Sequence, residues 1–231
     1  MVTKEEILGL IELLDKQLLL YEDPVYSPEE RKDIKRFEKL TLELYSDLKK
    51  DGYITLKIPE QERKEGLRMA RFSKIAVDIP NKLLKIEGFK AEEQWYILLS
   101  VYCWWCEAIK NVLSEVAIKI YQSLKGKEWE KEFITIGPFI NVMNEYRGGK
   151  YASLFLDITV DLRNSFVHGK VDFPNNEVVY YDSKEAEKKI SLKDFLSQFK
   201  RLPPLCTYLF AYRLKPFREE IEEFARKSGF V

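Results

Sequence analysis

The chain has 231 residues, 45% of them apolar and 13% aromatic, which excludes a disordered protein and allows a substantial buried core. Lys and Arg together number 38, as do Asp and Glu, so the formal net charge is zero. This balance argues against a scaffold that binds nucleic acid stably and without sequence preference, because such proteins usually carry a large positive excess. Any nucleic acid would be held transiently, by a local patch.

The distribution of apolar residues and cysteines predicts a cytoplasmic protein without a membrane segment. No apolar run approaches the roughly 18–20 residues that span a bilayer. The first six residues have the charged pattern of a helix start rather than of a signal peptide. Three cysteines, an odd number, provide no disulfide framework, which fits a reducing compartment. Most charged residues are Lys and Glu, a bias typical of heat-adapted proteins, so a thermophilic source is expected.

Helical periodicity dominates the N-terminal part of the chain. Apolar residues at helical spacing predict a helix over 3–22. The Ser-Pro-Glu-Glu pattern at 27–30 predicts the start of a second helix, which runs to about residue 50. Alternation over 53–58 predicts a short strand, and another helix is expected around 60–74.

The remaining pattern divides the chain into an α-helical N-terminal extension, 1–90, and a helical domain, 91–231. The domain is predicted to contain, in order, a long helix, two shorter helices, a small β-hairpin around a Pro-Asn-Asn turn, and two closing helices: 91–124, 137–148, 150–168, 171–181, 191–203 and 205–228. Ser191 and Asp194 are expected to cap the first closing helix. That helix is expected to be interrupted at Pro203-Pro204, and the last one to kink at Pro216. The predicted fold class is all-α, a helical bundle with one hairpin.

The only histidine, His168, lies at the end of the predicted helix 150–168, with Gly169 placed to terminate it. At helical spacing, one stripe of this helix carries two carboxylates, an amide and the imidazole: Asp157, Asp161, Asn164 and His168. Arg163 lies at the edge of the stripe. Imidazole titrates near neutral pH and suits proton transfer, and guanidinium suits phosphate because its forked donors match the oxygens. This stripe is the strongest candidate for a functional site.

The order of long helix, shorter helix, helix ending in Arg-Asn-x-x-x-His-Gly, hairpin and capped closing helix resembles the HEPN superfamily (higher eukaryotes and prokaryotes nucleotide-binding domains). The superfamily signature is an arginine, four to six residues and a histidine, commonly with a polar residue directly after the arginine. Residues 163–168, Arg-Asn-Ser-Phe-Val-His, match it with Asn164 in the polar position. The resemblance covers roughly residues 91–215.

The resemblance implies a metal-independent endoribonuclease without a cofactor, of toxin or defence type, which acts as a homodimer with the two motifs facing each other. It also implies that His168 exchanges protons with the ribose 2′-OH or the leaving oxygen, that Arg163 neutralises the scissile phosphate, and that Asn164 orients the phosphate or the histidine. One histidine per chain does not easily supply both proton transfers, whereas a symmetric dimer brings two. RNA is the expected transient partner, and an antitoxin or regulatory protein a further one.

Four more residues are candidates for supporting roles. Asp161 and Asp157 precede His168 on the polar stripe and are expected to hold positive charge on nearby basic groups, although carboxylates there also repel an RNA backbone. Arg147 and Lys150 bracket Gly148-Gly149 before the motif helix and are the candidate phosphate contacts.

An alternative interpretation needs no catalysis. His168 is then a helix-end residue whose charge complements the helix dipole, with Arg163 paired to Asp161 or Glu177. The domain is in that case a non-catalytic helical module that binds a protein partner or a nucleotide, because a fold alone does not establish a function.

A zinc site is a second alternative. It would use the only available set of three cysteines and a histidine: Cys103, Cys106, Cys206 and His168. Cys103 and Cys106 lie inside a predicted helix and no second cysteine pair follows, which favours buried free thiols and no metal.

Overall fold

The computed structural model describes residues 4–15, 17–24, 26–57, 90–131 and 133–230. The helix expected around 60–74 lies outside these residues. The chain forms two compact units: residues 59–207 make up one, and residues 1–58 together with 208–231 make up the other. This partition groups the C-terminal residues with the N-terminal extension, whereas the sequence division at residue 90 placed them in the helical domain.

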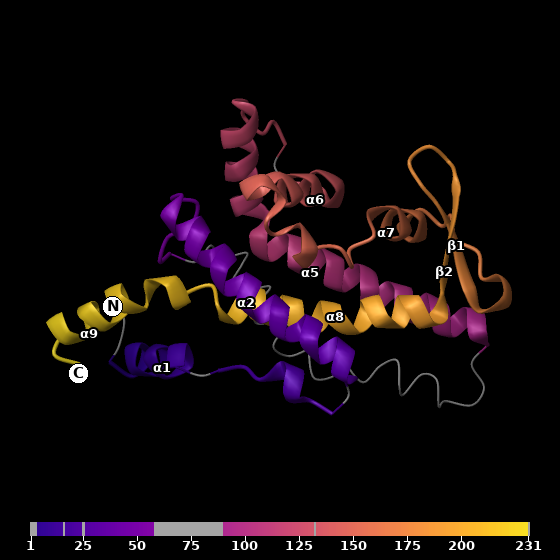
Figure 1. Cartoon of the computed structure of the whole chain (residues 1–231). Coiled ribbons are helices and arrows are strands. Elements are labelled where there is room, and N and C mark those ends of the chain that lie inside the picture. Colours follow the sequence, from indigo (N-terminus) through magenta and orange to yellow (C-terminus); the bar gives the residue numbers. More distant parts are fainter. Residues whose placement is uncertain (1–3, 16, 25, 58–89, 132, 231) are drawn as a thin grey trace. The chain divides into compact units, whose positions relative to one another are not determined.

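The unit built from both ends of the chain is helical (Figure 1). Its elements are α1 (Lys4–Asp15), η1 (Leu20–Glu22), α2 (Pro28–Lys50), the 3-10 turn η5 (Lys215–Phe217) and α9 (Arg218–Lys227), and α1 packs along α9. The predicted start of α2 is confirmed. The Ser27 hydroxyl accepts a hydrogen bond from the Glu30 amide, and the Ser27 amide donates to the Glu30 carboxylate, which together form a capping box.

Three expectations for this unit are wrong in detail. The helix expected over 3–22 ends at Asp15. Residues 53–57, the described part of the expected strand, form a turn and irregular chain, because no described segment pairs with them and an isolated strand is unstable. The expected last helix is divided, since α9 begins only at Arg218, after the turn that contains Pro216.

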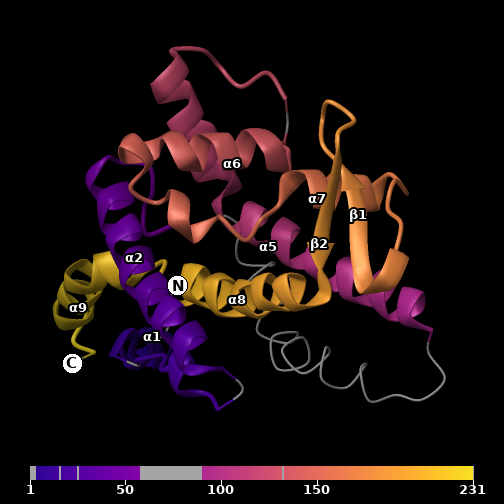
Figure 2. The same cartoon turned by 45° about the vertical axis from the view of Figure 1, so that its right-hand side comes forward.

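The larger unit consists of helices and one small antiparallel sheet (Figure 2). Its elements are α5 (Ala91–Lys125), α6 (Ile136–Glu145), η2 (Tyr146–Gly149), η3 (Ala152–Leu154), α7 (Val160–Val167), η4 (Pro174–Asn176), β1 (Glu177–Tyr181), β2 (Glu187–Ser191) and α8 (Leu192–Ala211), whose last turn belongs to the other unit. The long helix predicted over 91–124 is confirmed as α5. Gly126 ends it with a φ of +61°, a conformation that suits glycine. The described residues therefore confirm a mostly helical class with a small hairpin.

The helix α5 is the central element of this unit. Its buried face is broad, and side chains such as Trp105, Ile109 and Leu113 are fully buried. Both α6 and α7 pack against it, and α7 also contacts β1, so that the motif helix lies between α5 and the hairpin (Figures 1 and 2). Burial of this apolar surface fixes the position of the motif.

The hairpin follows the motif helix as expected, but its strands differ from the prediction. β1 pairs with β2, with Val179 opposite Lys189, whereas the segment 171–173 contributes only the bridge from Asp172 to Val179. The sequence of β2, Glu-Lys-Lys-Ile-Ser, carries three charges and one buried side chain, Ile190. It therefore lacks the alternation of apolar residues that signals a strand.

The helix expected over 150–168 is the main error in the helical prediction. Residues 152–154 form a short 3-10 turn, and α7 begins only at Val160. The buried Tyr102 hydroxyl donates to the Asp157 carbonyl at 2.9 Å and accepts from the Thr159 amide at 2.7 Å. In a longer helix these two backbone groups would pair with other backbone groups of the helix. Here the side chain of Tyr102 satisfies them instead.

The predicted cap of the first closing helix is confirmed, because the Ser191 hydroxyl accepts from the Asp194 amide at 3.2 Å. The predicted interruption at Pro203-Pro204 is wrong, since α8 continues to Ala211. Pro203 and Pro204 lack an amide hydrogen and so remove two donors from the helix. Complete burial of Phe199, Leu202 and Leu209 offsets this loss. Within the described residues, no helix combines the length and the apolar character needed to cross a bilayer.

Candidate functional site

The motif helix ends where the sequence predicts. His168 is the C-terminal cap of α7, and Gly169 follows with a φ of +67°. The Gly169 amide donates to the Phe166 carbonyl at 3.0 Å, and the Lys170 amide donates to the Ser165 carbonyl at 2.7 Å. This pair of bonds is a Schellman motif. It leaves the side chains of His168 and Lys170 exposed at the helix end.

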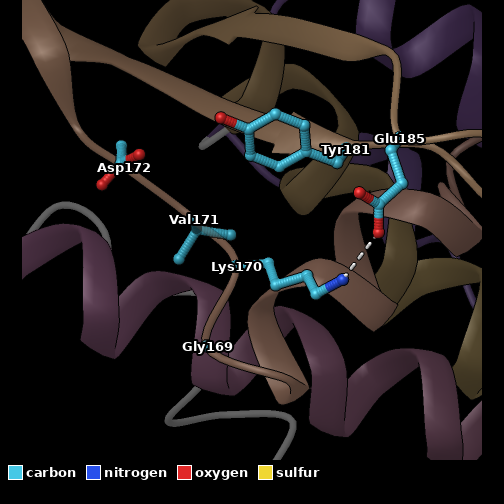
Figure 3. Close-up of a pocket in the computed structure, with 6 residues that line it drawn as sticks. All are labelled: Gly169, Lys170, Val171, Asp172, Tyr181 and Glu185. Atoms are coloured by element: carbon cyan, nitrogen blue, oxygen red, sulfur yellow. Dashed lines mark hydrogen bonds and ion pairs between the residues drawn. The ribbon is translucent and has the colours of Figure 1, made fainter.

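A cavity of about 490 Å³ contains His168. It is lined by residues of α7, of the segment that follows it and of the hairpin turn: Asp161, Asn164, Ser165, His168, Lys170, Tyr181, Asp182, Ser183 and Glu185. An adjoining cavity of about 250 Å³ shares Lys170, Tyr181 and Glu185 with it (Figure 3). Three of the predicted site residues, Asp161, Asn164 and His168, therefore face the same space.

Ser165 fixes the hairpin against the motif helix. Its hydroxyl donates to the Tyr181 carbonyl at 2.8 Å and accepts from the Tyr181 amide at 3.0 Å. The following turn is held by Asp182, whose carboxylate accepts from the amides of Lys184 and Ala186. These backbone bonds, more than the nearby Lys188, lower the pKa of Asp182. Both residues have a structural role in shaping the cavity.

Lys170 and Glu185, which line both cavities, form an ion pair with 3.1 Å between Nζ and Oε1 (Figure 3). Both side chains are well exposed, so the pair is weak. Glu185 has a φ of +62°, an unusual conformation for a residue other than glycine, in the hairpin turn. The pair places a cation and a carboxylate in the lining of the cavity that contains His168.

Arg163, the arginine of the Arg-Asn-x-x-x-His pattern, points to α5. Its Nη2 lies 2.6 Å from Oε1 of Glu107, and its Nη1 donates to the Asn164 side-chain carbonyl at 2.9 Å. Glu107 also pairs with Lys110 at 2.6 Å. The Nε atom of Arg163 is buried and finds no hydrogen-bond partner among the described residues. The ion pair that the sequence suggested, to Asp161 or Glu177, is thus replaced by one to Glu107.

The two carboxylates predicted to support the site lie in different environments. Asp161 lines the cavity, and its charge contributes, after burial, to a raised pKa of Tyr180. Asp157 precedes α7, is buried, and accepts from Nε and Nη2 of Arg201 on α8. Asp157 therefore does not share a helical stripe with His168, and its ion pair anchors the segment before α7.

The candidate phosphate contacts before the motif helix do not line the cavity. Arg147 lies in η2 with a φ of +52°, and Lys150 follows it with its ammonium 5.0 Å from the centre of the Tyr151 ring. Neither belongs to the described residues that line the cavity around His168.

The three cysteines are free thiols and are buried. Burial raises the pKa of Cys103 to about 12, and the pKa of Cys106 is raised well above its ordinary value for the same reason. His168, by contrast, is exposed. Among the described residues, no group of three or more His, Cys, Asp or Glu side chains is arranged to hold a metal ion.

The structure adds residues that the sequence did not indicate. Lys170, Ser165 and Glu107 have direct contacts with the site or with its arginine. Lys170 had a usable signal, since a residue that follows a helix-terminating glycine lies beside the helix end. Glu107 had a weaker signal, as an acid in a strongly apolar helix.

Comparisons of the chain with protein-family models, with curated proteins and with solved structures find no match.

Proposed function

We propose that this protein is a metal-independent endoribonuclease of HEPN type, which binds RNA transiently in the cytoplasm and cleaves it through attack of the ribose 2′-OH. The observation that carries the proposal is the shared cavity at the end of α7, lined by an exposed imidazole, an amide and an ammonium group. These are the groups that transphosphorylation of RNA requires: a proton-transfer group and donors for the phosphate.

In this proposal His168 transfers the protons. As a general base it removes the proton of the 2′-OH, whose oxygen then attacks the phosphorus atom. The bond from phosphorus to the 5′-oxygen breaks, that oxygen takes a proton, and a 2′,3′-cyclic phosphate is left. A second imidazole supplies the last proton, so the proposed active form is a homodimer in which the partner subunit's His168 acts as the acid.

The other residues have distinct roles. Lys170 and the amide of Asn164 bind the phosphate oxygens in the cavity. Arg163 positions Asn164 by donating a hydrogen bond to its side-chain carbonyl. Arg163 can contact a phosphate only if its ion pair with Glu107 breaks. Asp161 balances the positive charge that forms on His168.

The charges of the cavity favour a second function. Three carboxylates line the space that contains His168: Asp161, Asp182 and Glu185. These groups repel a polyanion and suit a basic segment of a protein partner, such as an antitoxin or a regulator. The alternative is therefore a non-catalytic helical module of HEPN type that binds a protein.

Cleavage of single-stranded RNA in the presence of EDTA separates the two functions. The nuclease proposal expects cleavage by the wild type, products that end in a 2′,3′-cyclic phosphate, and a rate at least about 100-fold lower for His168→Ala. Lys193→Ala, which changes a lysine at the start of α8, is the control variant and is expected to retain full activity.

Two outcomes contradict the nuclease. Undiminished cleavage by His168→Ala would assign the activity to another site or to a contaminant. No cleavage by a wild type that sediments as a dimer would leave the protein-binding module as the better assignment.

A further inference from the structure

The unit formed by residues 1–58 and 208–231 contains a basic cavity of about 610 Å³. Four cations and a single carboxylate line it, together with a hydroxyl and a proline: Lys49, Lys50, Lys215, Arg218, Glu219, Ser46 and Pro216. The lining itself therefore carries four positive charges and one negative charge, and carboxylates outside the lining pair with two of its cations. The volume lies within the range of about 300–1,000 Å³ that is typical of small-molecule sites.

We propose that this cavity binds closely spaced phosphate groups, as found in inorganic polyphosphate or in a nucleoside polyphosphate. Three chain segments bring the cations together: the last turn of α2, the turn η5 and the first turn of α9. The described lining has no aromatic ring and only one apolar side chain, which favours a compact, highly charged anion over a base or an apolar group.

Two of the cations are held in place by groups around the cavity. The Lys49 ammonium donates to the Pro216 carbonyl at 2.6 Å and pairs with Glu220, which fastens the end of α2 to η5. Arg218 pairs with Asp15 at 2.5 Å and with Glu222 at 2.6 Å. The bond to the Pro216 carbonyl positions the Lys49 ammonium before any ligand arrives, which lowers the ordering cost of binding.

The carboxylates that pair with Lys49 and Arg218 do not neutralise the site permanently. The side chains of Asp15, Glu220 and Glu222 are 54%, 42% and 37% exposed, and surface ion pairs of this kind are weak. A phosphate group with several negative charges can therefore displace them. The amides of the first turn of α9 add positive potential at the same place.

The other two cations of the lining differ in their exposure. Lys50 is exposed in the last turn of α2. Lys215 is half-buried with its ammonium 4.5 Å from the centre of the Tyr212 ring. Burial, followed by the neighbouring Arg218, lowers the pKa of Lys215, while Glu38 and Asp15 act in the opposite direction. A bound phosphate would stabilise the charged form of this lysine.

Calorimetric titration of the full chain with sodium tripolyphosphate, in EDTA and at low ionic strength, tests the proposal. The wild type is expected to bind with sub-millimolar affinity, and Lys50→Gln and Lys215→Gln are each expected to bind about tenfold more weakly. Lys227→Gln is the matched control, because Lys227 lies on α9 with a 75% exposed side chain and outside the cavity lining. It is expected to bind like the wild type.

The test does not depend on the proposed nuclease, because His168 lies in the other unit and His168→Ala is expected to bind tripolyphosphate normally.

A parallel titration with ATP distinguishes the two ligands. ATP binding at least tenfold tighter than tripolyphosphate points to a nucleoside polyphosphate, and equal binding of the two points to inorganic polyphosphate. The proposal is overturned if tripolyphosphate neither binds nor raises the melting temperature of the wild type. Equal weakening by Lys50→Gln and Lys227→Gln also overturns it.

Discussion

Arg163 of α7 and Glu107 of α5 form an ion pair with 2.6 Å between Nη2 and Oε1, and this pair holds Arg163 against the central helix. The side chains are 22% and 30% exposed, so water screens the pair only in part. In the proposed complex with RNA, a phosphate has to compete with Glu107 for the guanidinium. The availability of Arg163 is therefore set by a residue that lies 56 positions earlier in the chain.

Replacing Glu107 with Gln is expected to release Arg163 toward a phosphate. The amide keeps a hydrogen-bond acceptor and removes the charge that competes with RNA. We expect RNA affinity at low salt to rise several-fold and the free energy of unfolding to fall by about 1 kcal/mol. Fluorescence anisotropy with a short single-stranded RNA and urea unfolding measure the two quantities.

Glu145→Gln is the control for this variant, because Glu145 pairs with Lys125 of α5 at 2.7 Å in an exposed position. It removes the same charge from the same unit and should leave RNA affinity almost unchanged. Equal gains in both variants would show that net charge, and not the release of Arg163, determines binding.

The pair between Lys170 and Glu185 gives a second prediction at the cavity. Glu185→Gln removes the carboxylate that covers the Lys170 ammonium, and we expect RNA to bind several-fold more tightly with a steeper dependence on salt concentration. Lys170→Gln should have the opposite effect. Glu187→Gln, which removes an exposed acid that pairs with Lys189 in the same hairpin, serves as the control. A Glu185→Gln variant with unchanged RNA affinity would exclude Lys170 as a phosphate contact.

The features that the sequence predicted correctly depend on residues that are close in the chain. The capping box at Ser27 and the end of α7 at Gly169 are set within a few residues, so the pattern alone identifies them. The length of α5 follows in the same way from its apolar periodicity and from Gly126. The local order of motif helix, terminating glycine and hairpin was therefore predictable.

The errors concern contacts between distant residues. The position of Asp157 depends on Tyr102, 55 residues earlier, and on Arg201, 44 residues later. The partner of Arg163 is equally remote, and the charged strand β2 is held by its pairing with β1 rather than by its own pattern. No spacing rule contains this information. The fold class was accessible from the sequence, whereas the electrostatic state of the site was not.

Tyr102→Phe tests the contact that sets the start of α7. The substitution removes a buried hydroxyl and leaves the Asp157 carbonyl and the Thr159 amide without this partner, at an expected cost of about 1–3 kcal/mol in the free energy of unfolding. Urea unfolding followed by circular dichroism measures it. Tyr96→Phe, at a 46% exposed position on the same helix, should cost less than about 0.5 kcal/mol. Similar losses in the two variants would exclude this role of Tyr102.

The three thiols provide the last prediction. Burial raises the pKa of Cys103 to about 12, so only about one thiol in 10,000 is ionised at pH 8, and the thiolate is the reactive form. Cys106 and Cys206 are completely buried. We therefore expect the native protein to react very slowly with Ellman's reagent at pH 8, and all three thiols to react at once in guanidinium chloride.

A cysteine introduced at Leu124, which is 46% exposed near the end of α5, calibrates the assay, because Leu124→Cys should add one rapidly reacting thiol to the native protein. Rapid reaction of a native thiol at a comparable rate would mean that the Cys-x-x-Cys pair of α5 reaches solvent. The zinc interpretation of Cys103 and Cys106 would then regain support, since it requires an accessible thiolate. Slow reaction is the result that burial of these side chains against the core of α5 demands.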